Sequence, residues 1–311
     1  MSSTPDRGHL LTEQANPASE RLDELDTTAL VELFCYNDLE PQRAVQAAAP
    51  ALAAAVDAIA ERLRGGGRLF YLGAGTSGRL GVLDAAECPP TFCTPPELVQ
   101  GVLAGGAPAL LRSSEGLEDL SEAGRDDLLS RGFNAADALV GIAAGGTTPY
   151  VHGGLHHAQA IGALAIAMAC VPAEQAPMPC DLDIRLLTGP ELLTGSTRLK
   201  AGTATKMALN ILSTGVMVRL GKVHGNRMVD VAVTNSKLED RALRILKDLA
   251  GVERSRGSVL LEQAEGSVKL ALLMELGQRN AEGARQALAE HGPSLREVLE
   301  ALTGTSQMGS G

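Results

Sequence analysis

The sequence predicts an α/β protein built on a parallel sheet of about five strands with helices on both faces. Helix-patterned segments alternate with apolar runs of strand length, which is typical of parallel strands joined by helical crossovers. A glycine-rich run follows the first of these strands, as in many ligand-binding α/β domains. The expected strands lie at 69–72, 98–103, 138–143, 164–169 and 184–187.

Composition narrows the class of protein. The 311 residues carry a net charge of −10, which argues against a nucleic-acid partner because phosphates attract clustered Lys and Arg. Five cysteines without a Cys-x-x-Cys pair favour reduced thiols in a cytoplasmic protein over disulfides or a cysteine zinc site. No apolar run reaches the length of about 18 residues that a membrane span needs, so we expect no membrane partner.

We expect four parts along the chain. Residues 1–45 hold an N-terminal arm and a helix, and the polar stretch 1–20 is interpreted as an extended arm outside the core. Residues 46–237 form the sheet domain, which an Ala-rich helix over 44–63 enters and a long helix over 199–220 closes. Residues 304–311 are expected to be a disordered tail. Short helices are predicted in the C-terminal region 238–303, at 238–249, 268–276, 282–290 and 295–302.

The glycine-rich run Gly73–Arg79 predicts a phosphate-binding turn between a strand and a helix. Glycines let backbone amides approach a ligand, and a helix N-terminus favours an anion. A dinucleotide site would place an acidic residue at the tip of the next strand, near Ala104, where there is none. A turn that serves only close packing stays open. The candidate phosphate-binding residues are Gly75, Thr76, Ser77, Gly78 and Arg79.

Two further hydroxyl clusters precede helices, one at 145–149 after the third strand and one at 194–200 before the long helix. Each alone is typical of an ordinary helix N-cap, with Thr194, Ser196 or Thr197 as the cap of the long helix. Because ligands of open parallel sheets bind at the carboxyl ends of the strands, we expect all three turns to form one site. The clusters add Thr147, Thr148, Ser196, Thr197 and Lys200 as candidates.

Two acidic positions are candidates for proton transfer: Glu87, and a carboxylate within the run Glu115–Asp119. Each is also compatible with a solvated surface residue. The prolines after Cys88 are expected to end the helix at Glu87. Ten residues of helix from Ser77 span about 15 Å, which exceeds the reach of a hexose held by its phosphate. Either Glu87 serves a neighbouring subunit, or the helix breaks early.

No metal site is expected. His152 and His156 have the spacing of helical ligands, but the Glu of the His-Glu-x-x-His zinc motif is missing.

Several long runs resemble the N-acetylmuramic acid 6-phosphate etherase family of the sugar isomerase (SIS) superfamily, which is related to the glucokinase regulatory protein. The resemblance extends from Thr12 to about Leu302, and it implies an SIS-type three-layer sandwich with 46–237 as the sugar-phosphate domain. The runs that carry it include 73–92, 115–119, 189–206, Met228–Asp230 and Thr234-Asn235.

The resemblance implies cleavage of the D-lactyl ether of N-acetylmuramic acid 6-phosphate during peptidoglycan recycling, which gives N-acetylglucosamine 6-phosphate and D-lactate. It assigns the catalytic roles to Glu87, as proton donor to the departing lactate, and to Glu118, as the second acid/base. It implies no metal or organic cofactor, and a cytoplasmic homodimer with its sites near the interface.

The second turn departs from the family pattern Ala-Ser-Gly-Arg-Thr-Pro-Tyr. Gly145 and Thr147 replace its Ser and Arg, so one phosphate hydroxyl is missing, for which Thr147 or Thr148 could compensate. Two alternatives are a sugar-phosphate isomerase of the same fold and a non-catalytic sugar-phosphate-binding regulator. The changed turn favours the regulator, whereas the presence of both glutamates argues against it.

Overall fold

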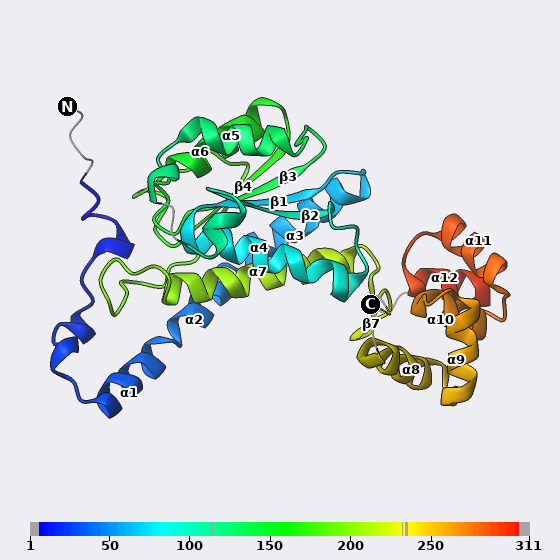
Figure 1. Ribbon diagram of the computed structural model, residues 1–311. Coiled ribbons are helices and arrows are strands. Elements are labelled where there is room, and N and C mark those ends of the chain that lie inside the picture. Colours follow the sequence, from blue (N-terminus) through cyan, green and yellow to red (C-terminus); the bar gives the residue numbers. More distant parts are fainter. Residues whose placement is uncertain (1–5, 113–114, 232, 234–235, 305–311) are drawn as a thin grey trace, which may run out of the picture. The chain divides into compact units, whose positions relative to one another are not determined.

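The computed structural model describes residues 6–112, 115–231, 233 and 236–304 (Figure 1). The chain divides into two compact units. The first contains Met1–Ala86 and Pro96–Gly215, and the second contains Glu87–Pro95 and Val216–Gly311. Of the expected disordered tail, 305–311 lie outside the described residues, as does the pair Thr234-Asn235.

The first unit is built on a five-stranded parallel sheet, as predicted, in the order β2-β1-β3-β4-β5. Gly73 at the end of β1 pairs with Leu103 of β2 and Ile142 of β3, so these three strands finish at the same edge. The turns that follow them therefore start side by side. The strands are β1 (Leu69–Gly73), β2 (Val99–Leu103), β3 (Ala138–Ile142), β4 (Leu164–Ala169) and β5 (Leu182–Arg185).

Helices cover both faces of this sheet. Figure 1 shows α5 and α6 over one face and α3 and α4 at the other. Between the layers, β1 and β3 are almost completely buried. The long helix predicted over 199–220 is confirmed as α7. The helices are α1 (Thr27–Asn37), α2 (Glu40–Ala47), α3 (Ala49–Arg64), α4 (Gly75–Phe92), α5 (Ser121–Ser130), α6 (Pro149–Ala160) and α7 (Lys200–Arg219).

The Ala-rich stretch 44–63 was predicted as one helix, which is wrong. It is divided between α2 and α3 at Ala48, and Pro50 lies in the first turn of α3. A proline is tolerated there because the first amides of a helix have no acceptor, whereas inside a longer helix its ring would clash with the preceding turn.

Among the described residues, no single helix is long and apolar enough to cross a membrane. The segments Thr27–Ala47 and Ala49–Arg64 reach the required length and composition only as a pair that is bent by 56°. The apolar character of α3 reflects burial, since Leu52 and Ile59 are at most 2% exposed in the core.

The N-terminal arm is not outside the core, contrary to the prediction for residues 1–20. Leu10 is 1% exposed and belongs to the same apolar cluster as Phe70 and Leu72 of β1. The next residue, Leu11, donates its amide to Oε1 of Gln175 at 2.8 Å. A pair of leucines among polar neighbours has no periodicity, so a pattern in the sequence could not reveal this burial.

The second unit is a small helical bundle around α10 (Val268–Leu276), in which every residue from Val268 to Met274 is buried. The buried ammonium of Lys269 binds Asp230 at 2.7 Å and two backbone carbonyls. The sequence predicted α10 and three neighbours but missed α9, whose charged residues and Gly257 obscure its pattern. The other elements are α8 (Ser236–Ala250), α9 (Arg254–Gln263), α11 (Ala281–His291), α12 (Leu295–Thr303) and a hairpin of β6 (Val223–His224) and β7 (Arg227–Met228).

Candidate functional site

The first turn joins β1 to α4 through an unusually close approach of backbone to backbone. A Cβ on Gly73 would lie 2.7 Å from the amide of Gly78, and a Cβ on Gly78 would lie 2.4 Å from the carbonyl oxygen of Gly73. Gly75 has a φ of +53°, which L side chains rarely adopt. The glycines are therefore required by the shape of the turn, which leaves the first amides of α4 without helical acceptors.

Arg79 follows this turn and was predicted to contact phosphate. Its Nε donates to the carbonyl oxygen of Ala109 at 3.0 Å, and a terminal nitrogen donates to that of Arg112 at 3.4 Å. The guanidinium thus fastens the segment after β2 to the start of α4.

The second turn connects β3 to α6 and keeps free donors. Among the described residues, the amides of Thr147 and Thr148 have no hydrogen-bond partner. Gly146 has a φ of +70°, and its carbonyl oxygen lies 2.7 Å from Nε2 of His152. His152 thus supports the turn from within α6. The two free amides and the adjacent threonine hydroxyls suit an oxyanion.

The third cluster precedes α7, where the protein itself supplies the anion. The carboxylate of Glu191 accepts the amides of Lys200 and Ala201 at 3.0 and 2.9 Å. The next two amides of α7 bond to the carbonyl oxygens of Thr197 and Leu199. All four amides at this helix end are therefore satisfied. Glu191, rather than a hydroxyl of 194–197, caps the helix. The local sequence does not indicate this cap, because Glu191 lies nine residues before Lys200.

Burial perturbs both charged groups at this helix end. Glu191 is 0% exposed and Lys200 is 3% exposed. Burial raises the pKa of Glu191, although its two amide hydrogen bonds oppose the shift. Burial also lowers the pKa of Lys200, against the opposing charge of Glu191. Each charge compensates the other inside the fold.

The three turns lie close together in the first unit. Thr76 of the first turn lies beside α7: if Gly202 carried a Cβ, that atom would be 3.5 Å from Cγ2 of Thr76. The N-terminal arm lies beside the other two turns. Oγ1 of Thr12 would be 3.6 Å from a Cβ on Gly145, and Oε2 of Glu13 would be 3.1 Å from one on Gly195. Thr12 is 1% exposed, and its hydroxyl has no partner among the described residues.

Glu118 lies beside the second turn. Its carbonyl oxygen accepts the amide of Tyr150, the second residue of α6, at 3.0 Å. The side chain of Glu118 is exposed and has no hydrogen-bond partner in the described part of the chain. The structure thus brings the backbone of this predicted acid/base next to Thr147 and Thr148.

Glu87 lies on α4, which does not end there as predicted. The helix continues to Phe92 and includes Pro89 and Pro90. The amide of Cys93 still bonds to the carbonyl oxygen of Pro89 at 2.9 Å. Two prolines remove two amide donors, but their φ suits a helix, so the last turn survives. An early break of this helix is therefore excluded, and the exposed Glu87 belongs to the second unit.

Asp84, three residues before Glu87, is a buried carboxyl that no motif in the sequence marks as a candidate. It accepts a hydrogen bond from the hydroxyl of Ser213 on α7 at 3.1 Å. Burial raises the pKa of Asp84 to about 6, and hydrogen bonds from Tyr71 and Ser213 and the charge of Lys206 oppose the rise. This carboxyl links β1, α4 and α7.

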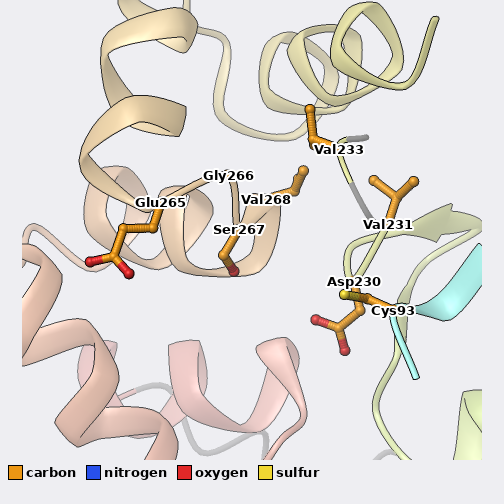
Figure 2. A pocket seen from close by; sticks show the side chains of 8 residues that line it. All are labelled: Cys93, Asp230, Val231, Val233, Glu265, Gly266, Ser267 and Val268. Carbon is orange, nitrogen blue, oxygen red and sulfur yellow. The ribbon is translucent and has the colours of Figure 1, made fainter. Parts of the chain in front are cut away.

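The second unit contains a separate pocket of about 260 Å³ (Figure 2). Asp230 and Cys93 lie on the side opposite Glu265 and Ser267. Asp230 forms ion pairs with Lys222 and Lys269, and Glu265 forms one with Arg285, so both carboxylates of the pocket already have cationic partners. None of the predicted site residues lines it. Within the described residues, no group of three or more His, Cys, Asp and Glu is arranged to hold a metal ion.

The five-stranded parallel sheet, with glycine- and hydroxyl-rich turns near the carboxyl ends of its strands, has the SIS-like α/β architecture that the sequence predicted. Residues 51–159 match the model of the glucokinase regulatory protein N-terminal SIS domain. A phosphoheptose isomerase from Francisella tularensis is 17% identical, with a TM-score of 0.44 over 62% of this chain and 98% of its own.

Much nearer relatives are named N-acetylmuramic acid 6-phosphate etherase. The protein of Synechococcus sp. (strain CC9902) is 72% identical over 98% of this chain and 96% of its own length. The protein of Nostoc punctiforme is 62% identical over 96% of this chain and 97% of its own length. The chain belongs to the N-acetylmuramic acid 6-phosphate etherase family.

Proposed function

We propose that the chain is a carbon–oxygen lyase that cleaves the D-lactyl ether of N-acetylmuramic acid 6-phosphate. The supporting observation is an identity of 72% over nearly the full chain with an enzyme of that name, together with the presence of both Glu87 and Glu118. The products are N-acetylglucosamine 6-phosphate and D-lactate. We assign the reaction to peptidoglycan recycling and the protein to the cytoplasm.

The chemistry follows from the open-chain form of the sugar. Its aldehyde makes the hydrogen at C2 acidic, so a carboxylate can remove it as lactate leaves C3. Water then adds at C3. We assign Glu87 as the acid that protonates the departing lactate and Glu118 as the second acid/base. This assignment needs no metal or organic cofactor.

The 6-phosphate is assigned to the edge of the sheet. The first turn supplies Gly75, Thr76, Ser77, Gly78 and Arg79, and the other turns supply Thr147, Thr148, Ser196, Thr197 and Lys200. The free amides of the second turn support an anion there. At the start of α7 only the side chains remain as donors, because Glu191 and two backbone carbonyls accept the amides.

We propose a homodimer in which the sites lie near the interface and Glu87 serves the partner's site. About 15 Å of unbroken helix separates Ser77 from Glu87, which supports a role for Glu87 outside its own phosphate turn. Large apolar side chains are exposed on α4 and α7, with Leu83 at 49% and Ile211 at 42%, as expected of surfaces that another copy covers.

Release of D-lactate from N-acetylmuramic acid 6-phosphate tests this function directly. Glu87→Gln and Glu118→Gln should each lower the rate by about 100-fold or more, since general acid–base catalysis contributes at least that much. Both variants should still bind N-acetylglucosamine 6-phosphate. Glu115→Gln, in the same acidic run as Glu118, is the matched control and should keep normal turnover. No lactate release by the wild-type protein would refute the proposal.

A further inference from the structure

Tyr150 makes two hydrogen bonds to the segment that carries Glu118. Its amide donates to the carbonyl oxygen of Glu118 at 3.0 Å, and its hydroxyl donates to Oδ2 of Asp127 on α5 at 2.6 Å. Glu118 precedes α5 by three residues, so the two bonds hold the start of the segment and the helix that follows. Tyr150 therefore ties this segment to α6 at two separate points.

The ring of Tyr150 cannot move freely between these bonds. The side chain is 1% exposed and packs in the same apolar cluster as Leu72 and Leu128. Burial and the neighbouring Asp127 carboxylate raise the pKa of Tyr150, so the hydroxyl stays protonated and remains a donor. A buried donor that loses its acceptor is costly, which keeps the pair together.

Two glycines let α5 and α6 touch along their backbones. A Cβ on Gly124 would lie 1.9 Å from the carbonyl oxygen of Tyr150, and one on Gly153 would lie 1.9 Å from that of Ser121. No side chain separates the helices at these points. The start of α5 consequently has little freedom relative to α6 and to the second turn that precedes it.

We propose that Tyr150 is a positioning residue that holds the backbone of Glu118 at a fixed place beside the second turn. The exposed carboxylate of Glu118 then extends from a backbone that is fixed relative to the start of α6. The proposal rests on the proposed function, because it assumes that Glu118 acts in proton transfer.

The test compares Tyr150→Phe with the wild-type chain. This variant keeps the ring and the amide bond to Glu118 but removes the bond to Asp127. We expect kcat to fall about 10-fold to 100-fold, since misplacing a catalytic group by about 1 Å has effects of that size. KM should stay the same, because the phosphate-binding turns are unchanged. Asp127→Ala should give the same loss, and Asp127→Asn, which keeps an acceptor oxygen, should stay close to wild type.

Asp137→Asn controls for a general loss of stability. Asp137 is 1% exposed and binds the guanidinium of Arg68 at 2.8 Å, at the amino end of β3 and so at the opposite edge of the sheet. This variant should lower Tm without lowering kcat. An unchanged kcat in Tyr150→Phe, or an equal loss of kcat in the control, would overturn the proposal.

Amide hydrogen exchange separates this proposal from the proposed function. In the full-length chain without substrate, the amides of Tyr150 and Leu120 should exchange faster in Tyr150→Phe than in wild type, whether or not the protein releases lactate. Unchanged exchange at both amides would show that Tyr150 does not hold the Glu118 segment. Missing lactate release with faster exchange would contradict only the proposed function.

Discussion

The second turn and the segment before α7 both place hydroxyl residues within a few positions of a helix start, yet they differ in whether the backbone amides there have hydrogen-bond acceptors. At α7 the first four amides are satisfied by Glu191 and two backbone carbonyls. At the second turn, the amides of Thr147 and Thr148 have no partner within the described residues. A helix end binds an external anion only where the protein has not supplied its own acceptors. The local sequence does not distinguish these cases.

Of the substitutions considered for the two helix starts, removal of the Glu191 carboxylate should lower stability the most. Glu191→Ala leaves two helix amides without their acceptor and removes the largest opposing charge near the buried Lys200. We therefore expect the free energy of unfolding to fall by about 3 kcal/mol or more, at about 1.5–3 kcal/mol for each charged hydrogen bond. Hydrogen exchange at Lys200 and Ala201 and the urea midpoint measure the effect. Glu191→Gln, which keeps one acceptor oxygen, should lose less. Equal stability of Glu191→Ala and wild type would show that the carboxylate does not close this helix end.

Asp84 differs from Glu191 because its carboxyl packs against the side of α7, where the backbone amides are already bonded within the helix. Asp84 therefore bonds to a side chain on α7, the hydroxyl of Ser213. Its pKa of about 6 exceeds the ordinary value of 3.8, so the folded chain holds the proton more tightly than the unfolded chain. Its contribution to stability is therefore lost as pH rises from about 4 to about 6.

Replacing Asp84 by Asn should remove the loss of stability that the wild-type chain shows as the pH rises. Relative to wild type, Asp84→Asn should gain up to about 3 kcal/mol between pH 4 and pH 7, at about 1.4 kcal/mol per pKa unit. Urea unfolding of both proteins across this range measures the difference. A difference that does not change with pH would contradict the raised pKa.

Substituting alanine for Gly195, before α7, or for Gly145, in the second turn, should change the stability least. Gly195, before α7, has a φ of +76°, so Gly195→Ala should cost about 1–2 kcal/mol. Gly145 has no positive φ, and the nearest atoms to a Cβ there lie at 3.6 and 4.0 Å. Gly145→Ala should therefore change stability by less than about 1 kcal/mol. Thermal unfolding of the two variants side by side checks the order, and a reversed order would contradict it.

The sequence alone predicted the five parallel strands, the glycine turn between β1 and α4 and the long helix over 199–220. These features are local: apolar runs of strand length mark buried strands, and glycine clusters mark turns. The run of residues shared with the family also selected Glu118 from its acidic neighbours. The continuation of α4 through Pro89 and Pro90 was not predictable from a rule that reads proline as a stop.

Only the tertiary structure decided which groups meet. Four placements depend on residues that are distant in the sequence or that follow no periodic pattern. They are the burial of Leu10 in the core, the position of Thr12 beside Gly145, the cap of α7 by Glu191 and the hydrogen bond from Tyr150 to Glu118. Hydrogen-bond satisfaction depends on every acceptor that folding brings near, and a local segment does not contain that information. The sequence therefore indicated candidate anion-binding turns, and the folded chain decided which of their backbone amides have no partner among the described residues.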